Sequence, residues 1–325
     1  MKLLTIDGYG YNLAVDGGRL EATNGHHINR PKQTTRYRRK TLDFDKVVIS
    51  GNHGTLSVSA IRWLVKQKRD IVILDWNGRL VTAFSPHANQ GVSKLAQLKA
   101  SQDPIKKTKI TKWLIQQKID GTMKNLAWIR SINHRFTYDS IIGKQFSRFK
   151  TVKSLREILG LESVISHYYF NAVSSVIDSK WEFITRHAEN TSVRDADDPV
   201  NALFNYGYSI LESECWKVIN TMGLEPHIGF IHTTHTNKAP MVYDLEEPFR
   251  WLVEKAMLKL IFEKKIRLSD FMTTDYGNVR LKPNSVKLVL DEIAKQFRTT
   301  VLYRGKRRQW STMIMLKTRE LIHLF

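Results

Sequence analysis

Two glycine-containing turns near the start of the chain most tightly limit how it can fold. Each lies between two strand-like runs: residues 11–15 and 19–23 flank Asp16-Gly17-Gly18, and residues 71–76 and 79–84 flank Asn77-Gly78. Turns of this composition adopt the positive φ angles that join neighbouring antiparallel strands, so each pair of runs is predicted to form a β-hairpin. Residues 1–85 are therefore predicted to form a small β-rich domain.

The segment between the two hairpins completes this predicted domain. Residues 47–50 are strand-like, and residues 57–67 have the spacing of a short helix that packs Ile61, Leu64 and Val65 against the sheet. A sheet domain of this size exposes unpaired strand edges, which favours pairing with a partner.

The residue pattern changes after the second hairpin. Turn-forming residues indicate a linker over 86–95, and from residue 96 apolar residues recur at helical spacing. Ser154 with Glu157 fits a capping box at a helix start, and Asp198-Pro199 places proline in the first turn of another helix. Gly160 is interpreted as a break before a further helix that opens at Glu162. The predicted fold class is α+β: a small N-terminal β-sheet domain, β-sandwich-like, followed by a larger all-α domain over 96–325.

Positive charge dominates the 325-residue chain. Lys and Arg number 51 against 31 Asp and Glu, a formal net charge of +20. The basic residues gather in four clusters, within residues 30–40, 106–118, 144–156 and 304–308. Any one cluster is equally well explained as a solvated helix face, but four of them favour binding to the phosphate backbone of nucleic acid.

Cysteine content and hydropathy restrict the compartment. The single cysteine, Cys215, cannot form an internal disulfide, which favours a reducing cytoplasm, and it is interpreted as a core residue. No cysteine pairs typical of zinc sites occur. The N-terminus lacks a signal-peptide pattern and no apolar run approaches the roughly 20 residues that cross a bilayer, so we expect no membrane association.

One histidine and a group of acids stand out against this basic background. His232 follows the apolar residues 228–231, a predicted buried strand or extended segment, and Asp244 and Glu247 follow twelve and fifteen residues later. Pro248 is expected to hold Glu247 in an extended conformation, so that both carboxylates point to one place. A divalent metal site for a polyanionic substrate is one interpretation. The alternatives are a hydrogen-bonded core histidine and acids that stabilise a helix N-terminus.

Four motifs in order closely resemble a known family. They are Arg-His-Ala-Glu-Asn at 186–190, Asp-Pro-Val-Asn-Ala-Leu-Phe-Asn-Tyr-Gly-Tyr at 198–208, Gly-Phe-Ile-His at 229–232 and Asp-Leu-Glu-Glu-Pro-Phe-Arg at 244–250. Together they resemble the CRISPR-associated integrase family, Cas-one, over nearly the whole chain. Ser50-Gly51-Asn52 resembles part of the family's N-terminal β-domain, and Tyr303-Arg304-Gly305 with Trp310 resembles its C-terminal helical signature.

This resemblance implies a metal site. In the family, a divalent ion is held by a glutamate on a helix, by the histidine of the Gly-Phe-x-His motif and by an acid of the following motif. Here these are Glu162, His232 and Glu247, with Asp244 as an adjacent catalytic carboxylate. Around Glu162, Ser163 replaces the family's glycine and Ser166 a small apolar residue. Two carboxylates and one imidazole suit Mg²⁺ or Mn²⁺.

Other polar residues compete for roles at such a site. His187, His227 and His235 are rival ligands, and His235 is also a possible DNA contact, with plain surface exposure as its alternative. Arg194 and Arg250 are candidates for phosphate contacts, or equally for salt bridges to Asp195 or Glu247.

The function implied by the resemblance is DNA integration, with residues 96–325 as the catalytic, DNA-binding domain and residues 1–85 as the dimerisation domain. The expected enzyme is a metal-dependent endonuclease and integrase that joins the 3′-hydroxyl ends of short DNA fragments (spacers) to target DNA in CRISPR adaptation, an antiviral defence. It would also act on branched DNA. Its expected partners are double-stranded and branched DNA, a second copy of the chain in a homodimer joined through the N-terminal sheets, and a Cas-two-type dimer.

Three alternatives to that function stay open. They are a casposase or stand-alone integrase of a mobile element, a branched-DNA repair nuclease, and a catalytically silent DNA-binding scaffold. The chain ends at Phe325, soon after the family's last helix and without an added helix-turn-helix domain, which favours the CRISPR context over the casposase. The intact Glu162, His232 and Glu247 argue against the scaffold.

Overall fold

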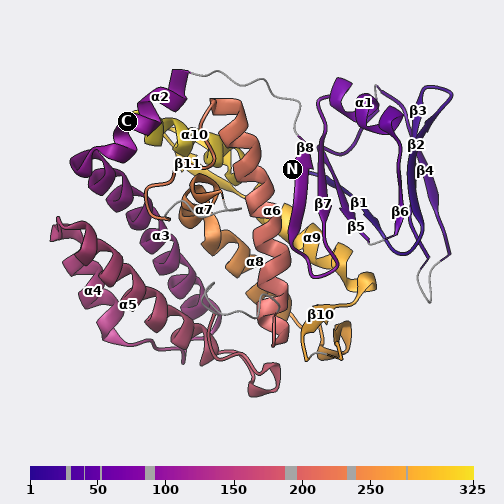
Figure 1. The fold of residues 1–325 in the computed structure, drawn as a ribbon. Coiled ribbons are helices and arrows are strands. Elements are labelled where there is room, and N and C mark those ends of the chain that lie inside the picture. The colour runs from indigo at the N-terminus through magenta and orange to yellow at the C-terminus, as the bar shows by residue number, and fades with distance from the viewer. Residues whose placement is uncertain are drawn as a thin grey trace.

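The computed structural model places an N-terminal pair of sheets beside a larger helical region (Figure 1). The residues that it describes are 1–26, 31–39, 41–51, 53–84, 92–186, 196–232, 239–275 and 277–325. The α+β prediction is therefore confirmed. The predicted linker falls partly on residues 85–91, outside this description, so the division into two domains stays a prediction.

The N-terminal region contains two four-stranded sheets. The first has the order β1 (Leu3–Asp7), β5 (Lys46–Ser50), β7 (Asp70–Leu74) and β8 (Leu80–Phe84). The second has the order β4 (Thr34–Tyr37), β3 (Arg19–Thr23), β2 (Tyr11–Asp16) and β6 (Gly54–Leu56). The two predicted hairpins are β2–β3 and β7–β8, both antiparallel as expected. Helix α1 (Val58–Lys66) connects β6 to β7; it buries Leu64 and leaves Val65 38% exposed, so the predicted packing of Val65 is wrong.

The first sheet is buried on both of its faces. In β5, Val47 and Ile49 belong to the core shared with the second sheet and α1, whereas Val48 belongs to the core of the helical region. Side chains alternate between the two faces of a strand, so one strand serves both cores. Burial of both faces explains why β5 and β7 are nearly continuous apolar runs.

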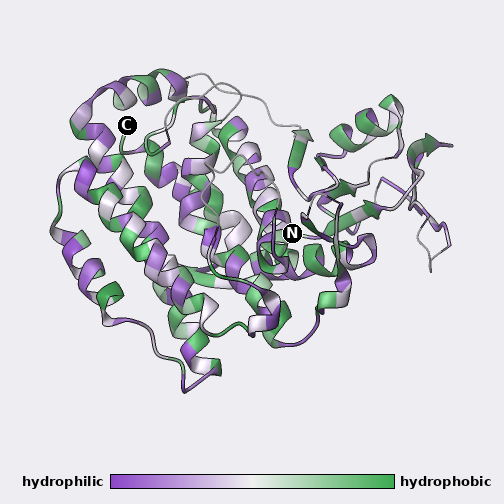
Figure 2. Ribbon diagram, turned by 60° about the horizontal axis from the view of Figure 1, so that its bottom comes forward, coloured by the Kyte–Doolittle hydropathy of each residue, from purple (hydrophilic) through white to green (hydrophobic). Residues whose placement is uncertain are grey.

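The helical region follows along the chain. Its helices are α2 (Val92–Gln102), α3 (Pro104–Ile132), α4 (Ser140–Thr151), α5 (Leu155–Ser174), α6 (Pro199–Met222), α7 (Pro240–Glu246), α8 (Arg250–Phe262), α9 (Pro283–Arg298) and α10 (Trp310–Ile322), with short 3₁₀ turns η1 (Ser179–Trp181), η2 (Glu247–Phe249) and η3 (Leu268–Asp270). Figure 2 shows hydrophobic and hydrophilic residues mixed along these helices, as expected for helices with one buried side. In the described residues, no helix is long and apolar enough to span a membrane.

Three predictions about this region are corrected. Helix α5 is continuous through Gly160, because the glycine is exposed while Ile158, Leu161 and Ile165 are buried and hold the helix in place. A helix tolerates one exposed glycine at about 1 kcal/mol. The region is also not all-helical.

Two short hairpins interrupt the helices. They are β9 (Phe271–Thr273) with β10 (Val279–Leu281), and β11 (Thr300–Tyr303) with β12 (Lys306–Gln309). Residues 228–231 form neither a strand nor a helix, so the strand alternative of the predicted strand or extended segment is wrong.

Buried ion pairs fasten α6 to the first sheet. The ammonium of Lys46, which is 1% exposed, lies 2.5 Å from Glu214 Oε1 and 2.9 Å from Ser213 Oγ. One turn further along, Lys217 Nζ lies 2.6 Å from Asp70 Oδ2. Removing one partner of such a buried pair leaves an uncompensated charge, so these contacts fix where α6 sits on the sheet.

Candidate metal and DNA site

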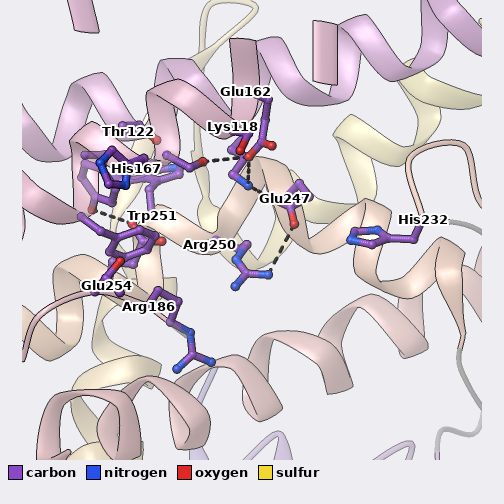
Figure 3. A pocket seen from close by; sticks show the side chains of 15 residues that line it. Lys118, Thr122, Glu162, His167, Arg186, His232, Glu247, Arg250, Trp251 and Glu254 are labelled. Atoms are coloured by element: carbon purple, nitrogen blue, oxygen red, sulfur yellow. Dashed lines mark hydrogen bonds and ion pairs between the residues drawn. The ribbon is translucent and has the colours of Figure 1, made fainter. Parts of the chain in front are cut away.

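Five segments distant in sequence line a cavity of about 450 Å³ in the helical region. They are α3, α5, residues 185–186, the segment that contains His232, and the segment from η2 into α8. Gly121 permits the close approach of α3, since a Cβ atom there would lie 2.2 Å from Cδ1 of Trp251 on α8. The cavity therefore depends on the packing of these helices against one another. Figure 3 shows its lining side chains.

Two of the predicted ligands meet at one cation. The Lys118 ammonium lies 2.6 Å from Glu162 Oε1 and 2.7 Å from Glu247 Oε2 (Figure 3). Ser166 donates a hydrogen bond of 2.8 Å to the same Glu162 oxygen, and Arg250 Nη1 lies 3.4 Å from Glu247 Oε1. The structure thus brings Glu162 and Glu247 together, with their negative charges facing one point.

The electrostatics of this cluster hold the carboxylate of Glu247 in its ionised form. Burial opposes the charge of Glu247, but the cations Lys118 and Arg250 outweigh burial and lower its pKa to about 2. Burial likewise opposes the charge of Lys118, and the nearby Glu247 and Glu162 more than compensate, which raises its pKa well above the usual range. Glu247 is therefore a carboxylate, and Lys118 an ammonium, at neutral pH.

Glu247 reaches the cavity by a different backbone geometry from the one expected. Its φ and ψ are −50° and −45°, which are helical values, and Pro248 occupies the first turn of η2. The predicted extended conformation is therefore wrong. A proline disfavours a helical residue before it but does not forbid one, and here α7, η2 and α8 run on as a nearly continuous, buried helical segment.

Asp244 lies behind His232 and orients it. Its carboxylate is 0% exposed and accepts hydrogen bonds from the backbone N–H groups of Phe230, Ile231 and His232. His232 Nδ1 lies 2.7 Å from Asp244 Oδ1. An imidazole held in this way at Nδ1 presents Nε2 to a metal or substrate, and in Figure 3 the ring points toward Glu247.

The glycine of the Gly-Phe-Ile-His motif has a steric role. A Cβ atom on Gly229 would lie 2.6 Å from Pro240 Cβ, 2.8 Å from the carbonyl oxygen of His232 and 3.0 Å from Asp244 Oδ2. Only glycine lets this segment fold so tightly over the Asp244 carboxylate. The motif therefore encodes a backbone loop that places His232.

Replacing Asp244 by asparagine is expected to weaken metal binding through His232 while the histidine itself stays in the chain. One Asp244 oxygen would be replaced by an NH₂ group, which cannot accept the hydrogen bonds that the backbone N–H groups of residues 230–232 donate to it. We expect the free energy of unfolding to fall by about 1–3 kcal/mol and the metal affinity to fall by roughly 10- to 100-fold. Calorimetric Mn²⁺ titration and thermal unfolding measure both effects. Asp291→Asn, at an exposed position of α9, is the matched control, and an unchanged Mn²⁺ affinity in Asp244→Asn would contradict this role.

Two arginines and one tyrosine form a further part of the site, which we term the arginine wall: Arg186, Arg250 and the Tyr208 ring. The Arg250 and Arg186 guanidinium carbons lie 4.4 and 5.0 Å from the Tyr208 ring centroid. Arg186 also donates hydrogen bonds to the Asn201 and Asn205 side chains on α6, at 2.7 and 2.9 Å. Two guanidinium groups held by an aromatic ring suit a phosphate group.

The buried Glu254 carboxylate supports the arginine wall. It accepts hydrogen bonds from the hydroxyl groups of Tyr169 (2.6 Å) and Tyr208 (3.0 Å) and from the side-chain amide of Asn125 (3.3 Å). Burial, with the nearby Glu254 carboxylate, raises the pKa of Tyr208, so its hydroxyl stays protonated as the donor. The ring under the two guanidinium groups is thereby fixed in position.

The residues present fit a divalent ion in chemistry, although one of their own cations stands between them. Two carboxylates and an imidazole are ligands for Mg²⁺ or Mn²⁺. The buried Oε2 of Glu247 has no hydrogen bond of good geometry among the described residues and faces the Lys118 ammonium. Within the same ranges, no three His, Cys, Asp or Glu side chains converge closely enough to hold an ion in the arrangement that the structure shows.

The other sequence-predicted residues divide into three groups. Arg250 lies in the cavity and pairs with Glu247, which is the salt bridge left open as its alternative. His227 pairs with Glu225 at the surface, away from the cavity lining, and Cys215 is buried as predicted. The remaining predicted residues, His187, Arg194, Asp195, His235 and Asn52, lie outside the described ranges.

Sequence reasoning missed three contributors to the site. In the sequence, Lys118 is one member of a basic cluster, and Arg186 and Tyr208 occur within the family motifs without an assigned role. The presence of Arg186 and Tyr208 in motifs shared with the family was a usable signal. No pattern in the chain links Lys118 to acids 44 residues and more away.

Comparisons with known proteins find relatives of this chain. The protein-family model described as CRISPR associated protein Cas1 matches residues 4–295. A similar curated protein, CRISPR-associated endonuclease Cas1 1 of Archaeoglobus fulgidus, is 28% identical over 98% of this chain and 95% of its own length.

Solved structures show the same fold. A casposase bound to integration product is 35% identical, with a TM-score of 0.90 over 99% of this chain and 90% of that chain. A chain of a Cas6-RT-Cas1–Cas2 complex has a TM-score of 0.72 at 18% identity, over 99% of this chain and 34% of that one.

Proposed function

The chain belongs to the CRISPR associated protein Cas1 family, and from this premise we propose that it is a metal-dependent DNA integrase. The observation that carries the proposal is the cavity, which is lined by Glu162, Glu247 and His232 together with Arg186 and Arg250 of the arginine wall. A carboxylate set beside paired guanidinium groups binds a divalent ion and a phosphodiester together. The net charge of +20 brings DNA to this cavity.

Each side chain has a role in the proposed reaction. Glu162, His232 and Glu247 would hold the Mg²⁺ or Mn²⁺ ion, and Asp244 orients His232. The ion supplies charge stabilisation at the reacting phosphate when it is bound. Arg186 and Arg250 bind phosphate oxygens and fix the scissile group within the cavity.

The proposed reaction is a transesterification. A donor 3′-oxygen forms a bond to a target phosphorus atom and loses its proton. The bond from that phosphorus to the target 3′-oxygen breaks, and this oxygen takes up a proton. One phosphodiester replaces another, so the equilibrium is nearly neutral. The reverse reaction, which resolves branched DNA, is therefore expected to occur at the same site.

A labelled duplex donor and a supercoiled plasmid test this function. Covalent attachment of the label to the plasmid is expected with Mg²⁺ or Mn²⁺, and it should disappear with EDTA or with donors that end in a 3′-deoxynucleotide. Joining that continues without a 3′-hydroxyl or without a divalent ion would refute the proposed reaction.

The biological context has two candidates. The Cas1 family match and the curated endonuclease relative favour spacer integration in CRISPR adaptation, and a structure that contains Cas1 and Cas2 supports a Cas2-type partner. The 35% identity and TM-score of 0.90 to a casposase favour the integrase of a mobile element. Spacers vary in sequence, whereas a mobile element has defined ends. If donors with scrambled end sequences are integrated as efficiently as donors with any one fixed end sequence, the CRISPR role is favoured. If integration depends strongly on one end sequence, the casposase role is favoured.

A homodimer through the N-terminal sheets is part of the proposal. Strand β8 is an edge of the first sheet and exposes Val81 (60%) and Phe84 (41%), and Tyr9, which follows β1 at the other edge of this sheet, is 66% exposed. Such apolar edges favour a two-fold contact. We expect the dimer to persist at about 0.5–1 M salt, where charge interactions are screened within a few ångströms. Light scattering measures this, and a monomer that still joins both donor ends in a coordinated way would contradict it.

A further inference from the structure

The position of Lys118 between two acids has a consequence for how the cavity takes up its ion. Its ammonium contacts Glu162 and Glu247 from a side chain that is 22% exposed. We propose that Lys118 is a built-in counter-cation: it holds the two carboxylates together in the metal-free protein and must leave that position when a divalent ion binds. This inference rests on the proposed metal site and adds a competitor to it.

Geometry makes the two cations mutually exclusive. Both carboxylate oxygens lie within 2.7 Å of the one nitrogen. A magnesium ion bound by the same oxygens would lie about 2.1 Å from each, in the space that the ammonium fills. The Lys118 ammonium and the ion would then lie almost in contact, and two positive charges so close together repel strongly in a partly buried site. The ammonium and the ion therefore compete for one pair of carboxylates.

The backbone under Lys118 stays in place while its side chain moves. The neighbouring residues Ile115 and Ile119 are 1% exposed and anchor this part of α3 in the core around α5. Lysine carries its charge on a flexible four-carbon stem, which an arginine fork does not. The cavity is open enough to receive the displaced ammonium. Displacement thus requires rotation about side-chain bonds and no movement of the helix.

The released ammonium gains a partner when DNA arrives. A phosphate group between Glu247 and the arginine wall would form an ion pair with the Lys118 ammonium, which no longer contacts the two carboxylates. DNA then favours ion binding and ion binding favours DNA, by the same factor in each direction. Lys118 in this way restrains ion uptake until a phosphodiester is present.

Metal-binding measurements on variants test the competition directly. Removing the ammonium in Lys118→Met should tighten Mn²⁺ binding without DNA by about tenfold or more, which corresponds to about 1.4 kcal/mol. Lys109→Met, a position nine residues earlier on α3 and outside the cavity lining, is the matched control and should stay within about twofold. Mn²⁺ affinity is read by electron paramagnetic resonance, and Mn²⁺-dependent thermal unfolding is an independent readout. A duplex that ends in a 3′-deoxynucleotide should tighten Mn²⁺ binding more in the original protein than in Lys118→Met.

Two further measurements cover the case in which Lys118→Met does not fold without metal. Lys118→Gln keeps a donor group for both carboxylates without its charge, so it should fold and still bind Mn²⁺ more tightly. In the unsubstituted protein, an amine-reactive label should modify Lys118 several-fold faster with saturating Mg²⁺ than without it, while Lys109 serves as the internal reference.

The outcomes separate this inference from the proposed function. If His232→Ala binds Mn²⁺ as tightly as the unsubstituted protein does, the proposed metal site itself is wrong. If His232→Ala abolishes binding but the Lys118 variants bind Mn²⁺ no more tightly, the metal site stands and the counter-cation inference is overturned. Labelling of Lys118 that does not respond to Mg²⁺ overturns it as well.

Discussion

Glu247→Ala is expected to lower the rate of DNA strand transfer by at least about a thousandfold, and Glu162→Ala and His232→Ala should do the same. The three side chains act around one ion, so losing any one removes most of the stabilisation of charge at the reacting phosphate. Combining two of the substitutions should reduce the rate little further, because the effects of residues that act as one unit do not add. Initial rates of plasmid joining measure this.

Binding and folding controls accompany these variants. DNA affinity should stay within a few-fold, because most of the basic clusters lie outside the cavity. The fold should also persist in Glu247→Ala, since Lys118 keeps Glu162 as a partner. Glu263→Ala, at the exposed end of α8, is the matched control. Full activity in His232→Ala would show that this histidine holds no ion.

Affinity for duplex DNA is expected to fall by about 10³- to 10⁵-fold between 50 and 200 mM salt, if the protein binds six to ten phosphates. The β11–β12 hairpin is a principal contributor, because all four residues of β12 are exposed and three of them are basic: Lys306, Arg307 and Arg308. Arg307→Glu with Arg308→Glu should lower the magnitude of the log–log salt slope by about 0.9 for each phosphate that the variant no longer neutralises. Fluorescence anisotropy over a salt series measures the slope.

Two further charge-reversal substitutions test where DNA lies on the protein surface. Reversal of Arg148 and Lys150 on exposed positions of α4 should also flatten the slope. Lys66→Glu, at an exposed position at the end of α1, should leave the slope unchanged, because α1 packs on the face of the first sheet that is turned away from the helical region. A slope that none of the hairpin or α4 reversals alters would show that these clusters do not face DNA.

Local signals predicted the fold where local chemistry determines it. Asn77-Gly78 predicted the β7–β8 hairpin, and Ser154 and Asp198 do cap α5 and α6 through hydrogen bonds to backbone N–H groups. The β11–β12 hairpin escaped prediction because its turn is Arg304-Gly305, with φ of 47° and 76°. An arginine at positive φ is uncommon, so composition did not mark that turn. Gly160 and Pro248 misled because tertiary packing overrode their local preferences.

The candidate site was predictable in its residues and less so in its arrangement. The motifs and the family resemblance that they carry selected Glu162, His232, Asp244 and Glu247, and the structure places three of them around one cavity with Asp244 directly behind His232. Sequence spacing did not separate a ligand from its support: Asp244 and Glu247 are three residues apart, yet one accepts backbone N–H groups and the other faces Lys118. The pairing of α3 with these acids exists only in the folded chain.

Helix α6 is one continuous helix that contacts both the first N-terminal sheet and the arginine wall. At one end, Asn201 and Asn205 hold Arg186, and Tyr208 lies under both guanidinium groups. Further along, Glu214 and Lys217 are fastened to β5 and β7. Asn205 and Glu214 are about 14 Å apart along the helix. In the proposed homodimer, a displacement of the N-terminal sheets would reach Asn205 and Tyr208 through one continuous helix, so assembly and the position of the arginine wall would be mechanically connected.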